Sequence, residues 1–105
     1  MSFKNPEDDK LRTLASATLA RTGALQAAAL RDTTGRTYVA INVAAGNFSL
    51  NALDAVFTVA MASQIDGIEA VVVTGVKPSE KAAISDYAPN APIWFCTSNG
   101  EVTQL

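Results

Sequence analysis

The apolar and polar positions of residues 23–63 predict two strands, a tight turn between them and one strongly apolar helix. Residues 24–30 are almost all small or apolar, and residues 37–43 are rich in β-branched and aromatic side chains, as strands typically are. Residues 32–35 favour a turn, because Asp32 can cap its own backbone and Gly35 tolerates a positive φ. These segments predict an antiparallel hairpin.

The central helix is predicted from Ser49, a suitable N-cap, to residue 63, because the apolar period there changes to about 3.6. Its apolar side comprises Leu50, Leu53, Phe57, Ala60 and Met61, with Val56 beside them, and its polar side comprises Asn51, Asp54 and Thr58. The apolar residues spread so widely around this helix that we expect it to be covered on more than one side.

The chain on either side of this block predicts a first helix and a buried strand. Residues 5–21 favour an amphipathic helix, in which Asn5 is the N-cap, Pro6 fits the first helical position and Gly23 ends the helix. Residues 68–74 form a nearly continuous apolar run, which indicates a strand buried on both faces and hence a central, parallel position.

The C-terminal part predicts a short helix and a second hairpin. The helix opens at residues 78–80 and extends to about Tyr87, because Pro89 disfavours its continuation. Residues 93–96 predict a buried strand, Asn99-Gly100 a hairpin turn, and residues 101–105 an antiparallel edge strand. The order αββαβαββ predicts an α/β fold in which helices cover both faces of a five-stranded mixed sheet.

Length and composition narrow the classes of protein. A chain of 105 residues is expected to form a single domain, residues 1–105, with one core. No apolar run approaches the roughly 20 residues of a membrane span, and the polar, acidic first ten residues do not resemble a targeting peptide. With a single cysteine, these features predict a cytoplasmic protein without a membrane partner. A net charge of −2 without a Lys/Arg cluster argues against nucleic acid as a partner.

The absence of histidine restricts the chemistry further. Zinc sites use three or four ligands drawn mostly from Cys and His, and this chain has one Cys and no His. A Ser-His or Cys-His nucleophilic pair is equally impossible. Any acid–base catalysis would therefore depend on a carboxylate, Lys or Tyr.

Several segments, taken in order, resemble the small cytidine deaminases. They are Ala28-Ala29-Leu30, Gly35-Arg36-Thr37-Tyr38 and Asn42-Val43 in the first hairpin, the stretch from Tyr87-Ala88-Pro89 to Pro92-Ile93-Trp94, and Asn99-Gly100-Glu101-Val102. The resemblance covers nearly the whole chain and implies the three-layer α/β/α fold of that family. It also implies homo-oligomers, with active sites completed by neighbouring subunits.

The same resemblance implies a zinc ion held at the starts of two helices, and here the sequence departs from the family. The first motif, Cys-Ala-Glu or His-Ala-Glu, supplies a ligand and the proton-shuttling Glu. Its positions fall on Leu53, Asp54 and Ala55 or, with a two-residue gap, on Asn51, Ala52 and Leu53. The thiolates of the second motif, Pro-Cys-x-x-Cys, fall on Ser79 and Ala82 or on Lys77 and Glu80. We therefore expect no zinc or other cofactor, and without the metal no hydroxide forms to attack a pyrimidine ring.

A few residues remain site candidates, each with an ordinary structural alternative. Asn42 and Asn51 are candidates for ligand binding. The resemblance places Asn42 in the family's substrate loop. The structural alternative for Asn42 is that Asn is common as a turn residue where a strand ends. Asp54 and Glu80 are the candidate catalytic bases, although a carboxylate in the first turn of a helix is favourable without any function. Cys96 is expected to be an inert core thiol.

Two functions from different classes follow. The first is a catalytically silent cytidine-deaminase-like protein that binds or self-assembles, as a homodimer or homotetramer, with or without a small nucleoside-like ligand at Asn42. The alternative is a metal-independent enzyme, deaminase-like or hydrolytic, with Asp54 or Glu80 as its base. A buried carboxylate in the former zinc pocket would favour the enzyme, whereas a pocket filled by Leu53, Phe48 or alanine side chains would favour the silent protein.

Overall fold

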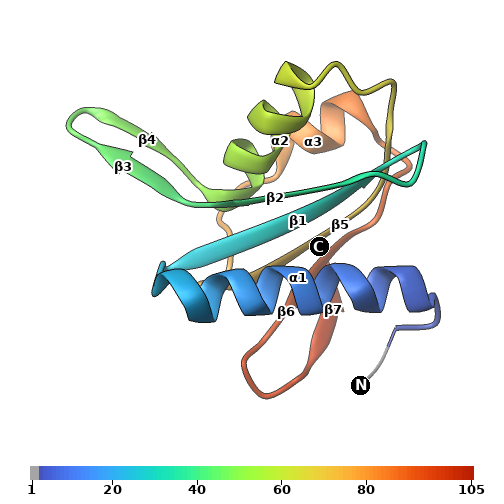
Figure 1. The fold of residues 1–105 in the computed structure, drawn as a ribbon, viewed down its shortest axis with the longest axis horizontal. Coiled ribbons are helices and arrows are strands. Elements are labelled where there is room, and N and C mark those ends of the chain that lie inside the picture. Colours follow the sequence, from blue (N-terminus) through green and yellow to red (C-terminus); the bar gives the residue numbers. More distant parts are fainter. Residues whose placement is uncertain (1–2) are drawn as a thin grey trace.

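A five-stranded sheet lies at the centre of the computed structural model, which describes residues 3–105 (Figure 1). In spatial order its strands are β2 (Thr37–Ile41), β1 (Gln26–Asp32), β5 (Ile68–Gly75), β6 (Ile93–Cys96) and β7 (Val102–Gln104). β5 and β6 are parallel, and the other neighbouring strands are antiparallel. The predicted mixed sheet is confirmed, with one hairpin at each edge.

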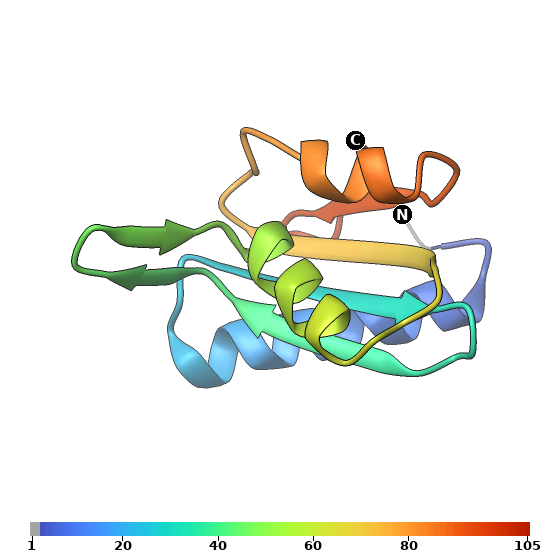
Figure 2. The ribbon, with the colours of Figure 1, turned by 90° about the horizontal axis from the view of Figure 1, so that it is seen from above.

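Helices cover both faces of this sheet, as the view in Figure 2 shows. The helix α1 (Pro6–Thr22) packs on one face, and the helices α2 (Ala52–Ala62) and α3 (Ala82–Tyr87) pack on the other. The buried side chains that meet across these interfaces include Leu11, Ala15, Ala29 and Val72 on the α1 side, and Val56, Ile84, Val71 and Val73 on the other side. The three-layer α/β/α arrangement is thereby confirmed.

β5 occupies the centre of the sheet, as its uninterrupted apolar run predicted. Its residues are buried except for Glu69, which is exposed, and Gly75 at its end, which is half-buried. Its pairing is parallel to β6 but antiparallel to β1, so the prediction of a parallel strand is correct on one side only. β1 lies between β2 and β5 and runs opposite to both, so β5 has an antiparallel neighbour on this side.

The first helix and the first turn form as the sequence predicted. The Asn5 side chain caps α1 by accepting a hydrogen bond from the Glu7 N–H at 2.9 Å, and Gly23 ends the helix with φ +66°. In the turn between β1 and β2, Asp32 Oδ1 accepts hydrogen bonds from the backbone N–H groups of Thr34 and Arg36, both at 2.9 Å.

Residues 43–50 form a small hairpin, where the sequence predicts a loop and the start of the central helix. Its strands are β3 (Val43–Ala45) and β4 (Phe48–Leu50), joined by Gly46-Asn47, with Gly46 at φ +61°. Ser49 is therefore a strand residue and not the N-cap, and Leu50 is not part of the helical stripe. The cap is Asn51, whose side chain accepts the Asp54 N–H and so fixes the start of α2 at Ala52.

The third helix also begins later than predicted. It starts at Ala82 instead of residues 78–80, and Lys81 precedes it without a side-chain cap. Residues 79–81 are exposed, whereas Ile84 within the helix is buried, so packing supports only the later residues.

Within residues 3–105, no helix combines the length and the apolar character needed to cross a membrane.

Candidate functional site

The start of α2 and the loop after β5 are joined by the side chain of Gln26, the first residue of β1. Its Oε1 atom accepts a hydrogen bond from the Ala52 N–H at 2.7 Å, and its Nε2 group donates one to the Val76 carbonyl at 2.7 Å. Gln26 is only 6% exposed. One buried amide therefore satisfies a donor at the N-terminus of α2 and also holds the segment that leads toward α3.

Asn42, a predicted ligand-binding residue, is engaged with the backbone of the same glutamine. Its Oδ1 atom accepts a hydrogen bond from the Gln26 N–H at 3.0 Å, and its own N–H donates to the Gln26 carbonyl at 3.2 Å. These two bonds fasten the end of β2 to the start of β1. The structure thus gives Asn42 a structural contact at the position where the resemblance implied a substrate contact.

Asn51, the other predicted ligand-binding residue, has the ordinary role of a helix cap. Its Oδ1 atom accepts the Asp54 N–H at 2.7 Å. This side-chain oxygen thus satisfies a backbone donor in the first turn of α2.

The two predicted catalytic carboxylates lie on different elements, and Asp54 does not line the cavity that Glu80 lines. Asp54 is half-buried in the first turn of α2, and Glu80 is exposed in the loop before α3. Glu80 lines a small cavity of about 190 Å³ together with Pro78, Ser79, Lys81 and Leu105. Within residues 3–105, neither carboxylate takes part in a hydrogen bond or an ion pair that would orient it as a base.

The residues at the former zinc positions do not fit a metal. Ala52 and Leu53 are fully buried in the core beneath α2, and Ala55 is also buried. At the second motif, the positions given by either count (Ser79 and Ala82, or Lys77 and Glu80) are exposed. Among residues 3–105, no three or more Cys, His, Asp or Glu side chains are grouped to hold a metal ion. The apolar and solvent-exposed positions offer no donor set suited to zinc.

The single cysteine lies on the opposite face of the sheet from α2 and α3. Cys96 is buried in the cluster that β6 and β5 form with α1, and burial raises the pKa of its thiol. Its position is that of a core thiol, as predicted, and it cannot contribute to a metal site at the starts of the other two helices.

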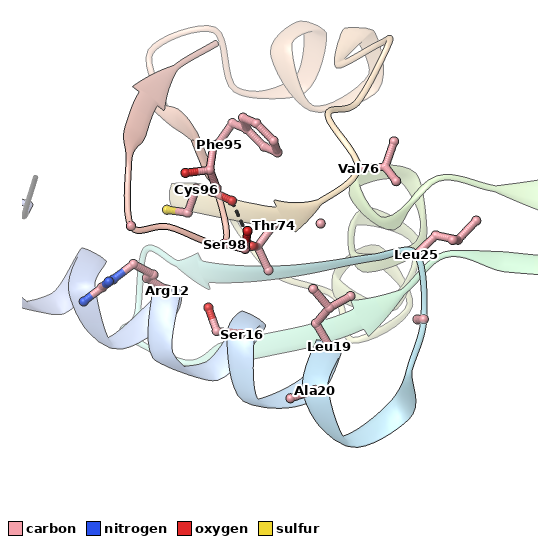
Figure 3. Close-up of a pocket in the computed structure, with 14 residues that line it drawn as sticks. Arg12, Ser16, Leu19, Ala20, Leu25, Thr74, Val76, Phe95, Cys96 and Ser98 are labelled. Carbon is pink, nitrogen blue, oxygen red and sulfur yellow. Dashed lines mark hydrogen bonds between the residues drawn. The ribbon is translucent and has the colours of Figure 1, made fainter.

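A large cleft, not foreseen from the sequence, opens between α1 and the carboxyl ends of β5 and β6 (Figure 3). Its volume is about 700 Å³. The residues that line it include Arg12, Ser16, Leu19, Leu25, Val76 and Cys96. No motif could have signalled this cleft, because its walls come from four separate segments of ordinary apolar and small residues.

The floor of this cleft depends on a glycine. Gly75 has φ +99°, and a Cβ atom at this position would lie 2.3 Å from the Leu25 carbonyl oxygen. The backbone of β5 can approach the start of β1 this closely only because Gly75 has no side chain.

Comparison with known proteins gives one family and several solved structures. The family described as cytidine deaminase-like matches residues 4–100. The crystal structure of cytidine deaminase from Burkholderia pseudomallei superimposes with a TM-score of 0.79 at 17% identity, covering 92% of this chain and 90% of that one. The cytidine deaminase from Mycobacterium leprae gives a TM-score of 0.66 at 20% identity, with 91% of each chain covered. For the Bacillus anthracis cytidine deaminase the TM-score is 0.74 at 13% identity, with 96% and 83% covered. No curated protein sequence matches the chain significantly.

Proposed function

Because the chain belongs to the cytidine deaminase-like family, we propose that it keeps the fold of that family as a catalytically silent protein that acts by binding or self-assembly. The observation that carries this proposal is the bond between Gln26 and Ala52. A metal-bearing residue is expected by resemblance at the start of α2. Here the helix instead begins with buried alanine and leucine side chains and with a backbone N–H already bonded to Gln26.

The packing of the first turn of α2 strengthens this proposal. Leu53 is fully buried, as expected for a filled pocket, whereas Phe48, the other residue expected to fill it, is exposed on β4. At the start of α2, Leu53, Ala52 and the Gln26 amide are buried, which agrees with a filled pocket. A buried carboxylate, which would have favoured an enzyme, is not among these residues.

A nucleoside contact through Asn42 has less support. The Asn42 oxygen already accepts the Gln26 N–H, so a ligand that used this oxygen would compete with a bond that joins β1 to β2. We therefore place the proposed binding function on protein surfaces in preference to a vestigial nucleoside pocket.

Self-assembly into a homodimer or homotetramer has support from exposed apolar side chains, although α2 carries few of them. α2 packs most of its apolar residues against the sheet and α3. Within residues 3–105, Val59 is the one large apolar side chain of α2 that is exposed. The more exposed large apolar residues are Leu25 and Val76, at the end of the sheet where β1 begins and β5 ends, and Phe48 in the hairpin of β3 and β4. Exposed apolar surface of this kind is a candidate for a contact with a second copy.

The activity test is incubation of the purified protein with cytidine and with deoxycytidine, followed by quantification of uridine and deoxyuridine. We expect no product above the uncatalysed background. Turnover that disappears in Asp54→Ala would contradict the proposal and establish the metal-independent alternative. A parallel preparation of Asp66→Ala, an exposed aspartate after α2, controls for contaminating deaminase, because contamination would persist in both variants.

A further inference from the structure

The hairpin of β3 and β4, residues 43–50, forms an arm that projects from the body of the protein (Figures 1 and 2). Residues 44–49 are exposed, and the Phe48 side chain is 57% exposed. Each strand has three residues, paired only with the other. Outside the hairpin, its principal contact is the junction of β4 with α2.

Such an arm is poorly stabilised by its own chain. An isolated two-stranded hairpin is marginally stable in water, and three-residue strands are at the short end of what occurs. Natural proteins protect open strand edges with charges, prolines or covering elements. Residues 37–53, which include the whole arm, contain no charged residue and no proline. These features are typical of a pair of strands that another surface covers.

The cleft beside α1 opens next to the base of this arm. Leu25, 69% exposed, and Val76, 57% exposed, stand at its mouth, and the Val76 N–H donates to the Leu25 carbonyl at 2.9 Å. The next residue, Gln26, is bonded to Asn42, where the arm begins. The arm points away from this cleft and so does not cover the cleft of its own chain (Figures 1 and 3).

We propose that two copies of this chain exchange their arms, so that Phe48 of each copy enters the apolar cleft between α1 and the ends of β5 and β6 of the other. An arm that leaves the body beside a cleft suits a two-fold contact, because in such a contact each copy supplies both the arm and the cleft. An aromatic side chain seated in an apolar pocket is the usual anchor of such an interface.

The charges of the two surfaces agree with this pairing. The arm is uncharged, and among the residues that line the cleft the only charged one is Arg12, which already pairs with Asp9 at 2.7 Å. Neither surface would therefore leave an unpaired charge buried on contact. This exchange rests on the self-assembly proposed above and specifies its surface and its anchor.

The test compares three forms of the full chain by sedimentation and light scattering at micromolar concentration. They are the native chain, Phe48→Ser in the arm, and Val59→Ser, a matched exposed apolar residue of α2 outside both arm and cleft. We expect a native dimer, weakened at least about tenfold by Phe48→Ser and unchanged by Val59→Ser. Because Phe48 is exposed, its replacement should leave the circular dichroism spectrum and the unfolding midpoint nearly unchanged, which separates loss of the dimer from loss of folding.

A disulfide trap provides the second readout. In a Cys96→Ser background, a chain with both Asn47→Cys and Val76→Cys, which keeps Phe48, is expected to give a reducible dimer, of twice the 11.0 kDa chain mass, under mild oxidation. A native oligomer that neither responds to Phe48→Ser nor forms this cross-link would overturn arm exchange and leave self-assembly standing. A native monomer would overturn both, whereas the catalytic part of the proposed function is decided separately by the activity test. Loss of the dimer in Val59→Ser alone would assign the contact to α2 and contradict the exchange.

Discussion

The Gln26 side chain accepts a hydrogen bond from the backbone N–H of Ala52 at 2.7 Å and so ties β1 to the first turn of α2. The same amide donates to the Val76 carbonyl, which places three segments of the chain around one buried side chain. The family resemblance implies a metal ion between the starts of two helices. In this chain a neutral amide is bonded to the first of these starts and to the loop after β5. The Gln26 connection to the start of α2 supports the silent family member that we propose.

Replacing Gln26 with leucine should destabilise the protein by about 2–3 kcal/mol, because the buried Ala52 N–H would lose its partner. The measurement is urea unfolding at neutral pH. Gln104→Leu, at an exposed position of β7, is the matched control and should change stability by less than about 0.5 kcal/mol. Equal effects of the two substitutions would show that the Gln26 connection contributes little.

A buried ion pair between α1 and β1 gives the second prediction. Arg31 Nη2 lies 2.7 Å from Asp8 Oδ1, and both side chains are more than nine-tenths buried, whereas Glu69, 2.6 Å from Arg31 Nε, is 51% exposed. Asp8→Ala should cost about 3 kcal/mol, because it removes a buried partner of a buried charge. Glu69→Gln should cost less than about 1 kcal/mol, because the Glu69 carboxylate is half-exposed and screened. The unfolding free energies of both variants check this ranking, and the reverse order would contradict it.

The pH dependence of stability should include a contribution from Asp32 in the first turn. Burial alone would raise the pKa of this carboxyl, but hydrogen bonds from the Thr34 hydroxyl and from the backbone N–H groups of Arg36 and Thr34, together with the Arg36 charge, lower it below the usual value. Because the folded pKa is the lower one, the ionised Asp32 stabilises the protein above its unfolded pKa of about 3.9, and this contribution is lost as the pH falls through the folded pKa.

Asp32→Asn should accordingly lower stability at neutral pH and flatten the acid limb of the stability profile. Urea midpoints measured from pH 7 down to about pH 3 test this expectation. Asp66→Asn, at an exposed aspartate in the loop after α2, is the comparison variant. If the acid limb of Asp32→Asn parallels that of the native protein, the Asp32 hydrogen bonds do not contribute in this way.

Much of the fold was predictable because it depends on local signals. Asn5 and Gly23 bound α1, and Asp32 and Gly35 form the first turn, each through contacts with residues a few positions away. The central position of β5 followed from its continuous apolar run. Such features need no knowledge of distant partners, so the sequence carries them directly.

The parts that sequence reasoning missed depend on distant partners or on short segments. Gln26 looked like a polar interruption of an apolar strand, since its partner Ala52 lies 26 positions away. The β3–β4 arm was missed because Phe48-Ser49-Leu50 is compatible with the approach to a helix, and its three-residue strands show too few alternations to identify a hairpin. The candidate carboxylates were chosen by residue type, and the structure puts Asp54 in the first turn of α2 and Glu80 beside a small cavity that Asp54 does not line.

The most direct test of a silent site is the zinc content of the untagged protein. The protein is expressed in zinc-supplemented medium and purified, and its zinc is measured by elemental analysis. We predict far less than one zinc per chain, and an unfolding midpoint that does not change when a chelator is added, because the helix starts present Leu53, Ala52 and a bonded backbone N–H instead of metal ligands. About one zinc per chain, lost together with the fold on chelation, would contradict a silent site, since that behaviour requires a structural or catalytic metal site.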